Sequence, residues 1–402
     1  MKNRLWILPL LVLCFPQMGL AQGGSIYSSF GFGDRFFEHS AAAAAMGSVS
    51  IALPSTTRIA SQNPALWSSV PSTRLETGYL FRQFVKQQAD RSIAHNNGKV
   101  QGIGLLIPTR SSLRTAVALG IRPYTTVNFY TSLQQSAGPD EATATIESLG
   151  TGGLSQLFIG TSFVPLPNLA VGAALVYTFG KIERSITISF PSGNYRNSFW
   201  RHTDWFSSPG AKIGIYYGGL ASWHFGAFVE LPGTATVSQQ QQYGTGRLPD
   251  TTFETRITTP LPLTAGIGIA HQWGHWLIGI DGVWQDYRSV RYNLHPEATY
   301  QTGYSIRLGG RWHMSRRHPK LSDLSSWYYF VGLRWDQLSI QVRQTAISSI
   351  AASLGMQIPV NAQTFLSVAL IAGRRGTLSN HLVQDWFFNI AFTFSVGERW
   401  FQ

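Results

Sequence analysis

The sequence is poor in charge, in cysteine and in long apolar runs. Only 12% of its 402 residues are charged, against about 25% in ordinary soluble domains. Beyond the N-terminus, the nearest candidate for a membrane-spanning helix is 163–180, where Pro165, Pro167 and Asn168 interrupt the apolar run. A spanning helix needs about 20 apolar residues, so this sequence argues against a helical membrane protein. The low charge also argues against a disordered chain and a coiled coil.

What the sequence does contain favours β-structure. It has 40 Gly, 24 Phe, 15 Tyr and 13 Trp, and 44% of its residues are hydrophobic. Without a spanning helix, this composition leaves a soluble all-β protein or a transmembrane β-barrel. A soluble chain of this length would normally divide into two or three domains, but no linker interrupts the sequence.

The first 21 residues are typical of a secretory signal peptide. Lys2 and Arg4 precede an apolar core at 5–15, and small residues at Gly19 and Ala21 form a cleavage site. We expect cleavage after Ala21, which also removes Cys14, the single cysteine. The mature chain would then have no disulfide, so an exported protein of this size must gain its stability in another way. A closed barrel in lipid provides it through a complete ladder of backbone hydrogen bonds.

The basic residues indicate which partners to expect. The formal net charge is +12, and the loss of Lys2 and Arg4 leaves 29 basic against 19 acidic residues. The basic residues are scattered singly, whereas nucleic-acid binding needs them clustered on one face, so no nucleic-acid partner is expected. On the surface of an outer membrane, arginines could bind lipopolysaccharide phosphates; solvated loop charge is the alternative.

Apolar and polar side chains alternate with a period of two. Between Tyr304 and Met314 most even positions are apolar, and the odd positions carry Ser, Arg, Gly or His; the same alternation recurs in 263–273, 327–336 and 386–396. Successive side chains on a strand point to opposite faces, and segments of about ten such residues are typical of membrane barrels. Aromatic residues end many of the apolar faces and fit interfacial girdles. A soluble sandwich would carry more charge on its outward face.

Counting these segments predicts an antiparallel transmembrane barrel of fourteen strands, with twelve and sixteen as alternatives. Predicted connections alternate between long ones, such as 125–153, 185–210 and 237–256, and short ones. Because outer-membrane barrels have long extracellular loops and short periplasmic turns, both barrel ends are expected in the periplasm. The predicted strands are 74–84, 99–107, 114–124, 154–164, 170–184, 211–219, 223–236, 257–273, 275–287, 302–314, 327–343, 346–358, 364–373 and 385–397.

The segment between the signal peptide and the barrel lacks the strand pattern. Residues 22–73 contain a run of alanines at 41–45, which favours a short helix at 38–46. An apolar, Ala- and Phe-rich segment needs a place to be buried, so we expect it to plug the barrel; a periplasmic tail is the alternative. The predicted organisation is a signal peptide at 1–21, a plug at 22–73 and a barrel at 74–402.

Motifs at both ends resemble those of a known family. The stretch 27–34, the Ala45-Met46-Gly47 and Asn63-Pro64-Ala65 motifs, and 397–401 near the C-terminus resemble FadL-type outer-membrane proteins, the long-chain fatty-acid and aromatic-hydrocarbon transporters, and in particular their Bacteroidetes branch. This resemblance implies a fourteen-stranded barrel and passive transport of a hydrophobic ligand. It also implies an N-terminal hatch, which carries Met46, Gly47, Asn63, Pro64 and Ala65. Some relatives, the PorV-like proteins, serve type IX secretion.

Charged residues within predicted strands should face the lumen. Arg or Lys on the lipid face at the bilayer midplane costs about 2–4 kcal/mol, so inward placement is forced. Two interpretations follow: these charges form ion pairs that hold the plug, or an arginine meets a substrate carboxylate. The candidate lumen residues are Asp281, Arg307, Arg311, Arg334 and Asp336.

Motifs for catalysis, cofactors and metals are weak. His271 and His275 flank a predicted turn at Gly274, and no Glu follows His271, so the helical zinc motif is not matched. The glycine pattern at 31–33 lacks the third glycine of a dinucleotide site, and no G-x-S-x-G elbow occurs. We therefore expect no metal, cofactor or enzymatic activity; a lipase- or protease-like barrel using a lumenal Ser or His is the alternative.

The predicted function is passive passage of a hydrophobic or amphipathic small molecule through the outer membrane. The alternative is a non-transporting scaffold or a partner of a secretion system. Pro123 cannot donate a ladder hydrogen bond, so Arg122-Pro123 is either a strand end or, by resemblance, a lateral opening.

The last strand is a candidate signal for insertion. Its lipid face carries Phe392, Phe394 and Val396, followed by Trp400 and Phe401. By resemblance, the barrel assembly machinery is expected to recognise this aromatic-ended strand. Lipid and lipopolysaccharide are the other expected partners.

Overall fold

A computed structural model describes residues 24–88, 91–109, 111–136, 143–191, 195–245, 249–292, 296–313 and 326–398. The signal peptide and the C-terminal Trp400 and Phe401 lie outside these residues.

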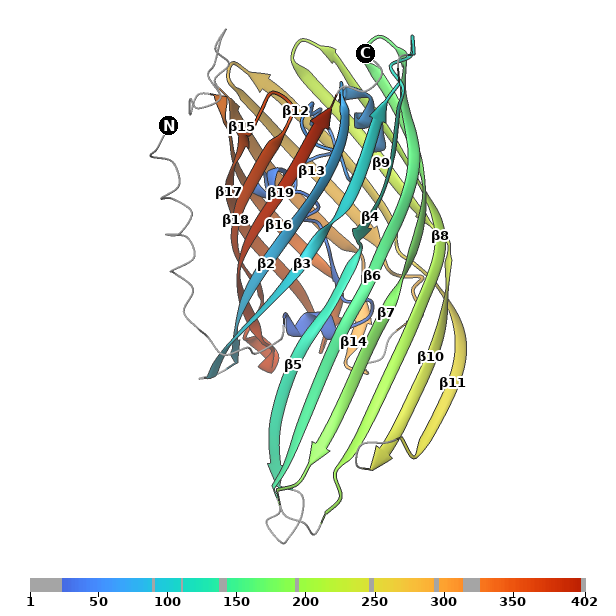
Figure 1. Ribbon diagram of the computed structural model, residues 1–402. Coiled ribbons are helices and arrows are strands. Elements are labelled where there is room, and N and C mark those ends of the chain that lie inside the picture. Colours follow the sequence, from blue (N-terminus) through green and yellow to red (C-terminus); the bar gives the residue numbers. More distant parts are fainter. Residues whose placement is uncertain are drawn as a thin grey trace.

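Within the described residues, fourteen antiparallel strands form a barrel (Figure 1), which confirms the predicted count. Four of these strands are divided into two labelled segments. The strands are β2 (Thr73–Gln88), β3 (Arg91–Pro108), β4 (Ala116–Pro123) with β5 (Thr125–Ser136), β6 (Thr143–Leu166), β7 (Leu169–Ser189), β8 (Ser198–Leu220), β9 (Trp223–Pro232) with β10 (Thr234–Thr245), β11 (Thr251–Pro260) with β12 (Leu263–Trp273), β13 (Trp276–Asp286), β14 (Ala298–Tyr300) with β15 (Gly303–His313), β16 (Tyr328–Val342), β17 (Thr345–Pro359), β18 (Phe365–Gly376) and β19 (Gln384–Glu398).

The last strand closes the barrel by pairing with the first. β19 runs antiparallel to β2 from Glu398 opposite Thr73 to Gln384 opposite Gln87. Both barrel ends therefore lie at the same rim, together with short turns such as the one at Gly274, whose φ is +56°. We assign this rim to the periplasm, because the projecting strand ends and most of the longer connections lie at the other rim.

The outward faces match a lipid layer. In β13, Ile278 and Ile280 are exposed between Trp276 and Trp284. These two tryptophans are eight positions apart, which at about 3.3 Å per residue spans about 26 Å along the strand. At a strand tilt of about 40° this covers about 20 Å of the roughly 25 Å tall apolar band of a membrane barrel. The alternate residue, Asp281, is completely buried, so the predicted inward and outward faces hold along this strand.

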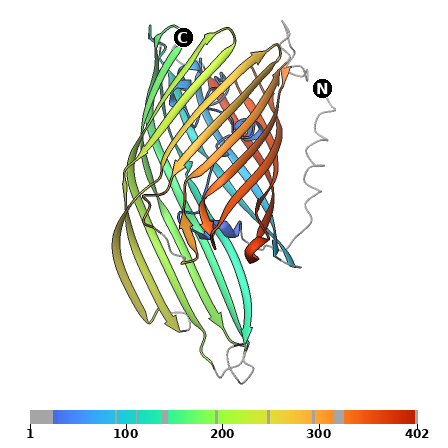
Figure 2. The ribbon, with the colours of Figure 1, turned by 180° about the vertical axis from the view of Figure 1, so that it is seen from behind.

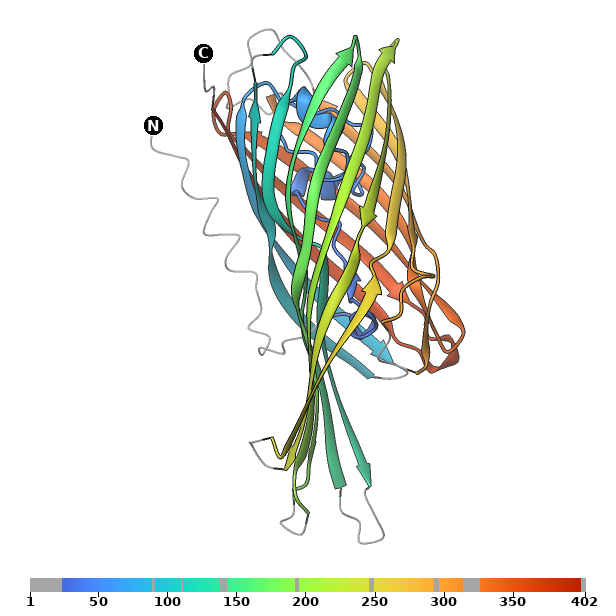
Figure 3. The same cartoon turned by 90° about the vertical axis from the view of Figure 1, so that its right-hand side faces the viewer.

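Four of the predicted long loops are wrong, and most of the first of them, 85–98, belongs to β2 and β3. Residues predicted as the connections 125–153, 185–210 and 237–256 belong largely to strands that continue beyond the barrel. β6 alone has 24 residues, about twice the length needed to cross a bilayer. The six strands β5, β6, β7, β8, β10 and β11 form a flap that projects past the rest of the barrel (Figures 1 and 3). The prediction missed them because it limited strands to about the length that crosses a bilayer, whereas these strands continue into water.

The flap begins where several strands carry proline or glycine. Pro123 ends β4 opposite Ser155, while Gly180 of β7 lies opposite Leu154. On the next strands, Pro209 lies in β8, Gly233 separates β9 from β10, and Pro260 ends β11. Proline removes ladder donors and glycine relaxes the backbone, so this band lets the flap depart from the course of the barrel.

On one side, the flap separates from the neighbouring wall. β3 pairs with β4 only from Ile103 to Pro108, opposite Ala116 to Ile121. Beyond that point β5 pairs with β6 and carries no barrel strand on its other edge. Figure 1 shows β3 and β5 diverging past the end of β4.

The N-terminal segment lies inside the barrel (Figure 2). It contains η1 (Ile26–Ser29), β1 (Asp34–Arg35), α2 (Ala41–Ala45) and η2 (Pro64–Ser69), so the helix predicted at 38–46 is present in shortened form. The Ser40 side chain caps α2 by accepting from the Ala43 amide at 3.3 Å. We call residues 24–72 the plug. No helix in the described ranges is long and apolar enough to cross a membrane.

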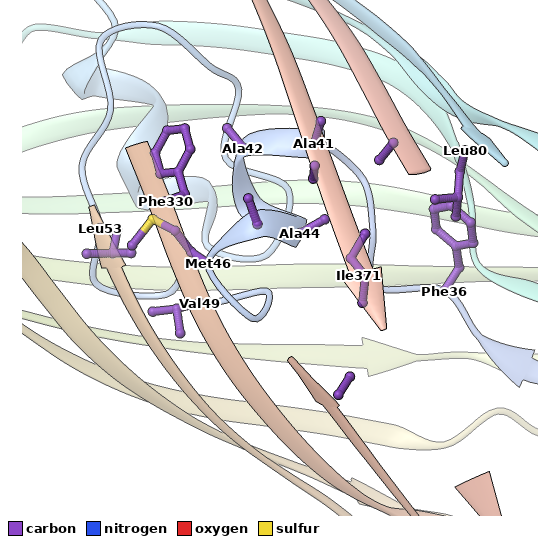
Figure 4. Close-up of a cluster of buried hydrophobic side chains, with 14 of the residues drawn as sticks. Phe36, Ala41, Ala42, Ala44, Met46, Val49, Leu53, Leu80, Phe330 and Ile371 are labelled. Atoms are coloured by element: carbon purple, nitrogen blue, oxygen red, sulfur yellow. The ribbon is translucent and has the colours of Figure 1, made fainter. Parts of the chain in front are cut away.

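The plug helix packs directly on the wall. All five alanines of α2 are buried, and its small side chains lie near Ile371 of β18 and Phe330 of β16 (Figure 4). Met46, Val49 and Leu53 continue the same cluster. A helix of methyl side chains approaches the strands closely, so the alanine run serves packing in addition to its helix propensity.

Candidate functional site

The Met46-Gly47 motif sits against glycines of the wall. Gly47 has a φ of +64°, which favours glycine. A Cβ atom built on Gly332 would lie 2.0 Å from the Gly47 nitrogen, and one on Gly309 would lie 2.3 Å from the Met46 oxygen. Backbone therefore meets backbone at this point, which explains why the motif and the wall both need small residues.

The Asn63-Pro64-Ala65 motif fixes the other end of the plug. The Asn63 side chain accepts from the Ala65 amide at 3.1 Å, which caps η2. Its amide group donates to the Ile51 oxygen at 2.8 Å and to the Ile215 oxygen of β8 at 2.9 Å. One buried side chain thus joins two plug segments to the wall, while Pro64 occupies the first helical turn, where its missing N–H costs nothing.

Glu38 is the centre of a buried ion-pair network. Arg334 donates to Glu38 at 3.0 Å, and an Arg82 nitrogen lies 3.5 Å from the other carboxylate oxygen. Arg334 also lies 3.0 Å from Asp336. Burial by itself would raise the pKa of Glu38, but Arg334 and Arg82 together lower it to about 2. The neighbouring plug residue His39 has a pKa well below its usual range, because of burial and then the positive charge of Arg122.

Asp281 and Arg307 bind the plug backbone. Asp281 accepts from the Ser50 and Ile51 amides at 2.7 and 3.0 Å. Arg307 donates to the Ser48 oxygen at 3.1 Å. The five predicted lumen residues all face inward; Arg311 is the least enclosed, with its guanidinium 5.5 Å from the centre of the Tyr328 ring. Four of the five thus lie in contacts with the plug or with each other, and whether any of them meets a ligand stays a prediction.

A second network, centred on Glu230, was not predicted. Lys212 lies 2.7 Å from Glu230 and directly opposite it on the paired strand. Arg35 of the plug lies 3.6 Å from the same carboxylate, and Gln156 donates to it at 2.6 Å. The available signal was the same as for the predicted residues, namely charges in the middle of predicted strands, which must face inward.

The Arg122-Pro123 pair lies where the wall divides. Arg122 is buried and donates to the Gln156 side chain at 3.1 Å and to the Ser61 oxygen of the plug. Pro123 ends β4, and the chain resumes as β5 two residues later, so the proline marks a break within a continuing strand. A small cavity of about 40 Å³ is lined there by Ile103, Arg122 and other residues.

Further plug contacts lie toward the extracellular rim. Asp34 pairs with Arg375 of β18 at 2.5 Å, and Ser25 donates to Asp385 of β19 at 2.5 Å. Phe32 of the plug stacks on the ring of Tyr292, which donates to Asp204 of β8 at 2.6 Å. Around the barrel, the plug is thus held by side chains from at least seven strands: β2, β4, β9, β13, β15, β16 and β18.

The largest described cavity lies in the extracellular half of the lumen. It has a volume of about 80 Å³, and Phe30, Phe37, Phe84, Tyr287 and Arg334 are among its lining residues. Small-molecule sites usually enclose about 300–1,000 Å³. This cavity therefore has no room for a long-chain ligand.

The structure also places the last-strand aromatic residues and a histidine that the sequence singled out. Phe392 and Phe394 of β19 are exposed on the lipid face; their role in assembly stays a prediction. His271 lies against Trp223, with ring centres 4.3 Å apart. Among the described residues, no three His, Cys, Asp or Glu side chains are grouped to hold a metal ion.

The barrel with its internal plug has the fold seen in FadL-type structures. Similar solved structures include a Pseudomonas aeruginosa FadL homologue (TM-score 0.61, 12% identity, covering 89% of this chain and 97% of the other). The Ralstonia pickettii toluene transporter TbuX (0.60, 13%, 89% and 98%) and the Pseudomonas putida toluene transporter TodX (0.59, 13%, 90% and 99%) are also similar. TbuX and TodX are transporters, and at such identities the likeness shows the fold alone.

The chain belongs to the BamG family, whose family model matches residues 1–402. No curated protein matches the sequence.

Proposed function

We propose that the protein is a plugged barrel that serves as a structural subunit of an outer-membrane protein assembly. The plugged lumen carries this proposal: ion pairs and hydrogen bonds from many strands hold the plug, and the largest described cavity is about 80 Å³. The family name BamG supports a connection with barrel assembly. It favours an assembly partner over the secretion-system partner that the sequence resemblance also implies.

The energetics support a plug that stays in place. Removing one member of a buried ion pair costs about 3–5 kcal/mol, and the Glu38 and Glu230 networks both join plug and wall. Moving the plug out would separate these charges together with the backbone contacts at Asp281. A transporter would have to offset this cost in every cycle, whereas a scaffold has no need to move its plug.

Conductance in planar bilayers tests whether the lumen is closed. We expect the mature wild-type protein to show no stable channels and a variant lacking residues 24–66 to conduct, because the deletion removes the segment that fills the barrel. A heat-modifiable band on gels would verify that the deletion variant still folds. Steady wild-type channels as large as those of the deletion variant would contradict a closed lumen.

Purification from native outer membranes tests the role as a subunit. The tagged wild-type chain is expected to bring down a protein partner at fixed stoichiometry, and this partner should remain after washing in high salt. A wild-type chain that purifies alone after mild cross-linking would refute the subunit role.

Passage of a small hydrophobic compound is a second candidate function. The aromatic lining of the largest cavity and the cavity beside Arg122 favour it. On this proposal, a compound smaller than a long-chain fatty acid would leave sideways near Pro123. Lipid and lipopolysaccharide would then surround the exit.

A disulfide across the wall tests this exit. Ile103 and Ile121 are the last pair of the β3–β4 ladder and line the wall cavity, so Ile103→Cys with Ile121→Cys should close it. The matched control is Ile280→Cys with Leu308→Cys, another lipid-facing pair on β13 and β15. Uptake of a hydrophobic probe should fall only with the first disulfide. If uptake survives that cross-link undiminished, the compound does not leave through this part of the wall.

A further inference from the structure

The flap has an edge that other parts of this chain begin to cover. β5 pairs with β6 on one side, and on the other side β1 pairs with its first two residues, Asp34 opposite Thr126 and Arg35 opposite Thr125. Farther along, the Asn128 amide donates to the Ser28 side chain at 3.1 Å. The edge of β5 that faces away from β6 therefore already pairs with an added strand at its first residues, and the plug supplies that strand.

The contacts that cover this edge of β5 end near the extracellular rim of the barrel. The Tyr130 oxygen accepts from Lys86 at 3.1 Å, at the extracellular end of β2. Because backbone groups of an antiparallel strand face its two neighbours alternately, Ser132 and Gln134 share the orientation of Asn128 and Tyr130. Within the described residues, no hydrogen bond satisfies the backbone of Ser132 or Gln134 on this side, and side chains 131–136 are all exposed.

The two edges of the flap differ in chemistry. Natural edge strands are usually protected from pairing by charged residues or proline. β11, the opposite edge, carries Glu254 and Arg256 and ends at Pro260. β5 has neither a charged residue nor a proline from Thr125 to Ser136. Of the two edges, only that of β5 lacks the usual protection.

An apolar face adjoins this unprotected edge. Leu133 pairs with Ile146, which pairs with Ile188, so the three side chains form one row on the inner face of the flap. The next row contains Ile186 and Trp200. Leu133 is 59% exposed. Because the flap projects beyond the rest of the barrel (Figure 3), this face meets water rather than lipid.

We propose that the β5 edge at 130–136 binds one strand of a second, surface-exposed protein. The fitting segment is extended, uncharged and about five or six residues long, and its alternate apolar side chains extend the row at Leu133. Backbone hydrogen bonds provide affinity in such strand addition, and the alternate side chains provide specificity. This inference rests on the proposed function, since it says where the assembly partner docks.

Symmetry disfavours a second copy of this chain as the occupant. Two identical β5 edges that pair antiparallel are related by a two-fold axis perpendicular to the strands. The strands run lengthwise along the barrel (Figure 1), so this axis would point the two barrels in opposite directions. Two copies in one outer membrane share one direction, which leaves a different protein as the partner.

Matched substitutions on the two edge strands test the docking face. Leu133→Lys and Phe253→Lys replace inner-face residues of nearly equal exposure, 59% and 58%, on β5 and β11. The tagged full-length variants would be purified from native outer membranes, and the partner quantified by mass spectrometry. We expect at least a tenfold loss of partner with Leu133→Lys and wild-type recovery with Phe253→Lys. Equal recovery with both variants would overturn the proposal.

A backbone variant tests the edge itself. Ser132→Pro with Gln134→Pro removes two N–H groups that face away from β6, so the ladder to β6 stays intact. Heat-modifiability on gels verifies folding, and loss of the partner is expected. Ser132→Cys, oxidised against cysteines placed in the partner, then maps the bound segment. A cross-link to a charged or helical segment, or to another copy of this chain, would refute the proposal.

The outcomes separate this inference from the proposed function. If the wild type and every β5 variant retain the partner, the proposed docking site is refuted and the subunit role stands. A wild type that purifies alone removes both.

Discussion

Gly47 in the plug and Gly332 in β16 touch backbone to backbone. A methyl group on Gly332 would lie 2.0 Å from the Gly47 nitrogen, closer than any real side-chain contact. The Gly47 amide also donates to Ser353 of β17 at 3.0 Å. The plug is thus seated against two adjacent strands at a position where neither partner has room for a side chain.

Gly332→Ala should therefore loosen the plug. Overpacking a filled interior usually costs about 1–3 kcal/mol, so we expect a lower melting temperature and faster proteolysis within 24–72. Gly282→Ala is the control, because the nearest atom to its added Cβ is the Ile267 Cγ1 at 4.0 Å. Equal melting temperatures for the two variants would show that the glycine contact does not hold the plug.

Glu38→Gln should destabilise the folded protein by about 3 kcal/mol, because it leaves Arg82 and Arg334 in the lumen without their shared carboxylate. Denaturant unfolding in detergent, followed by tryptophan fluorescence, measures the change. Glu147→Gln, on the partly exposed part of β6 in the flap, is the control and should have little effect. A Glu38→Gln protein as stable as wild type would mean that packing alone retains the plug.

Acid should remove the contribution of the Glu38 carboxylate to the stability of the folded protein. The folded pKa of Glu38 is about 2, against an ordinary 4.5, so its stabilising effect is fully present above pH 4.5 and is lost as the pH falls toward 2. The stability difference between wild type and Glu38→Gln is expected to shrink over this range. Carboxylates remote from Glu38 titrate equally in both proteins, so the difference reports the Glu38 network. A difference that stays constant down to pH 2 would contradict this assignment.

Deleting residues 398–402 should sharply lower the amount of folded barrel. By resemblance to other outer-membrane barrels, the assembly machinery reads the last strand, whose lipid face carries Phe392 and Phe394, together with Trp400 and Phe401. Quantifying the heat-modifiable form in outer-membrane fractions measures the effect. Truncating residues 22–24 is the control for a terminal deletion, and normal levels after the C-terminal deletion would refute the prediction.

Local pattern was sufficient to predict the membrane-spanning part. Along β13 the alternation of Trp276, Ile278 and Ile280 with buried positions such as Asp281 follows from the period of a strand. In lipid every charge must turn inward, so the pattern predicted both the strand and the face on which Arg307 and Arg334 lie. The alanine run likewise predicted a short helix.

Pattern was not sufficient in the flap. Residues 185–189 and 198–205 of β7 and β8 were predicted as a loop although Ile186 and Ile188 alternate with polar residues, because the strand predicted before them already had the length needed to cross a bilayer. Their strand structure depends on the neighbouring strands, whose ladder pairs them through Thr187 and Phe199. The length of a projecting strand is set by this pairing and not by the thickness of the bilayer.

The sequence by itself determined the barrel, the strand count and the inward direction of its charges, because lipid enforces these features residue by residue. Only the tertiary structure decided which partner each charge has. Glu38 meets Arg334, 296 positions away, and Glu230 meets Lys212 and Arg35, because closing the barrel around the plug brings those side chains together. The unprotected edge of β5 was also decided at that level, since a strand becomes an edge only when its neighbour, here β3, turns away.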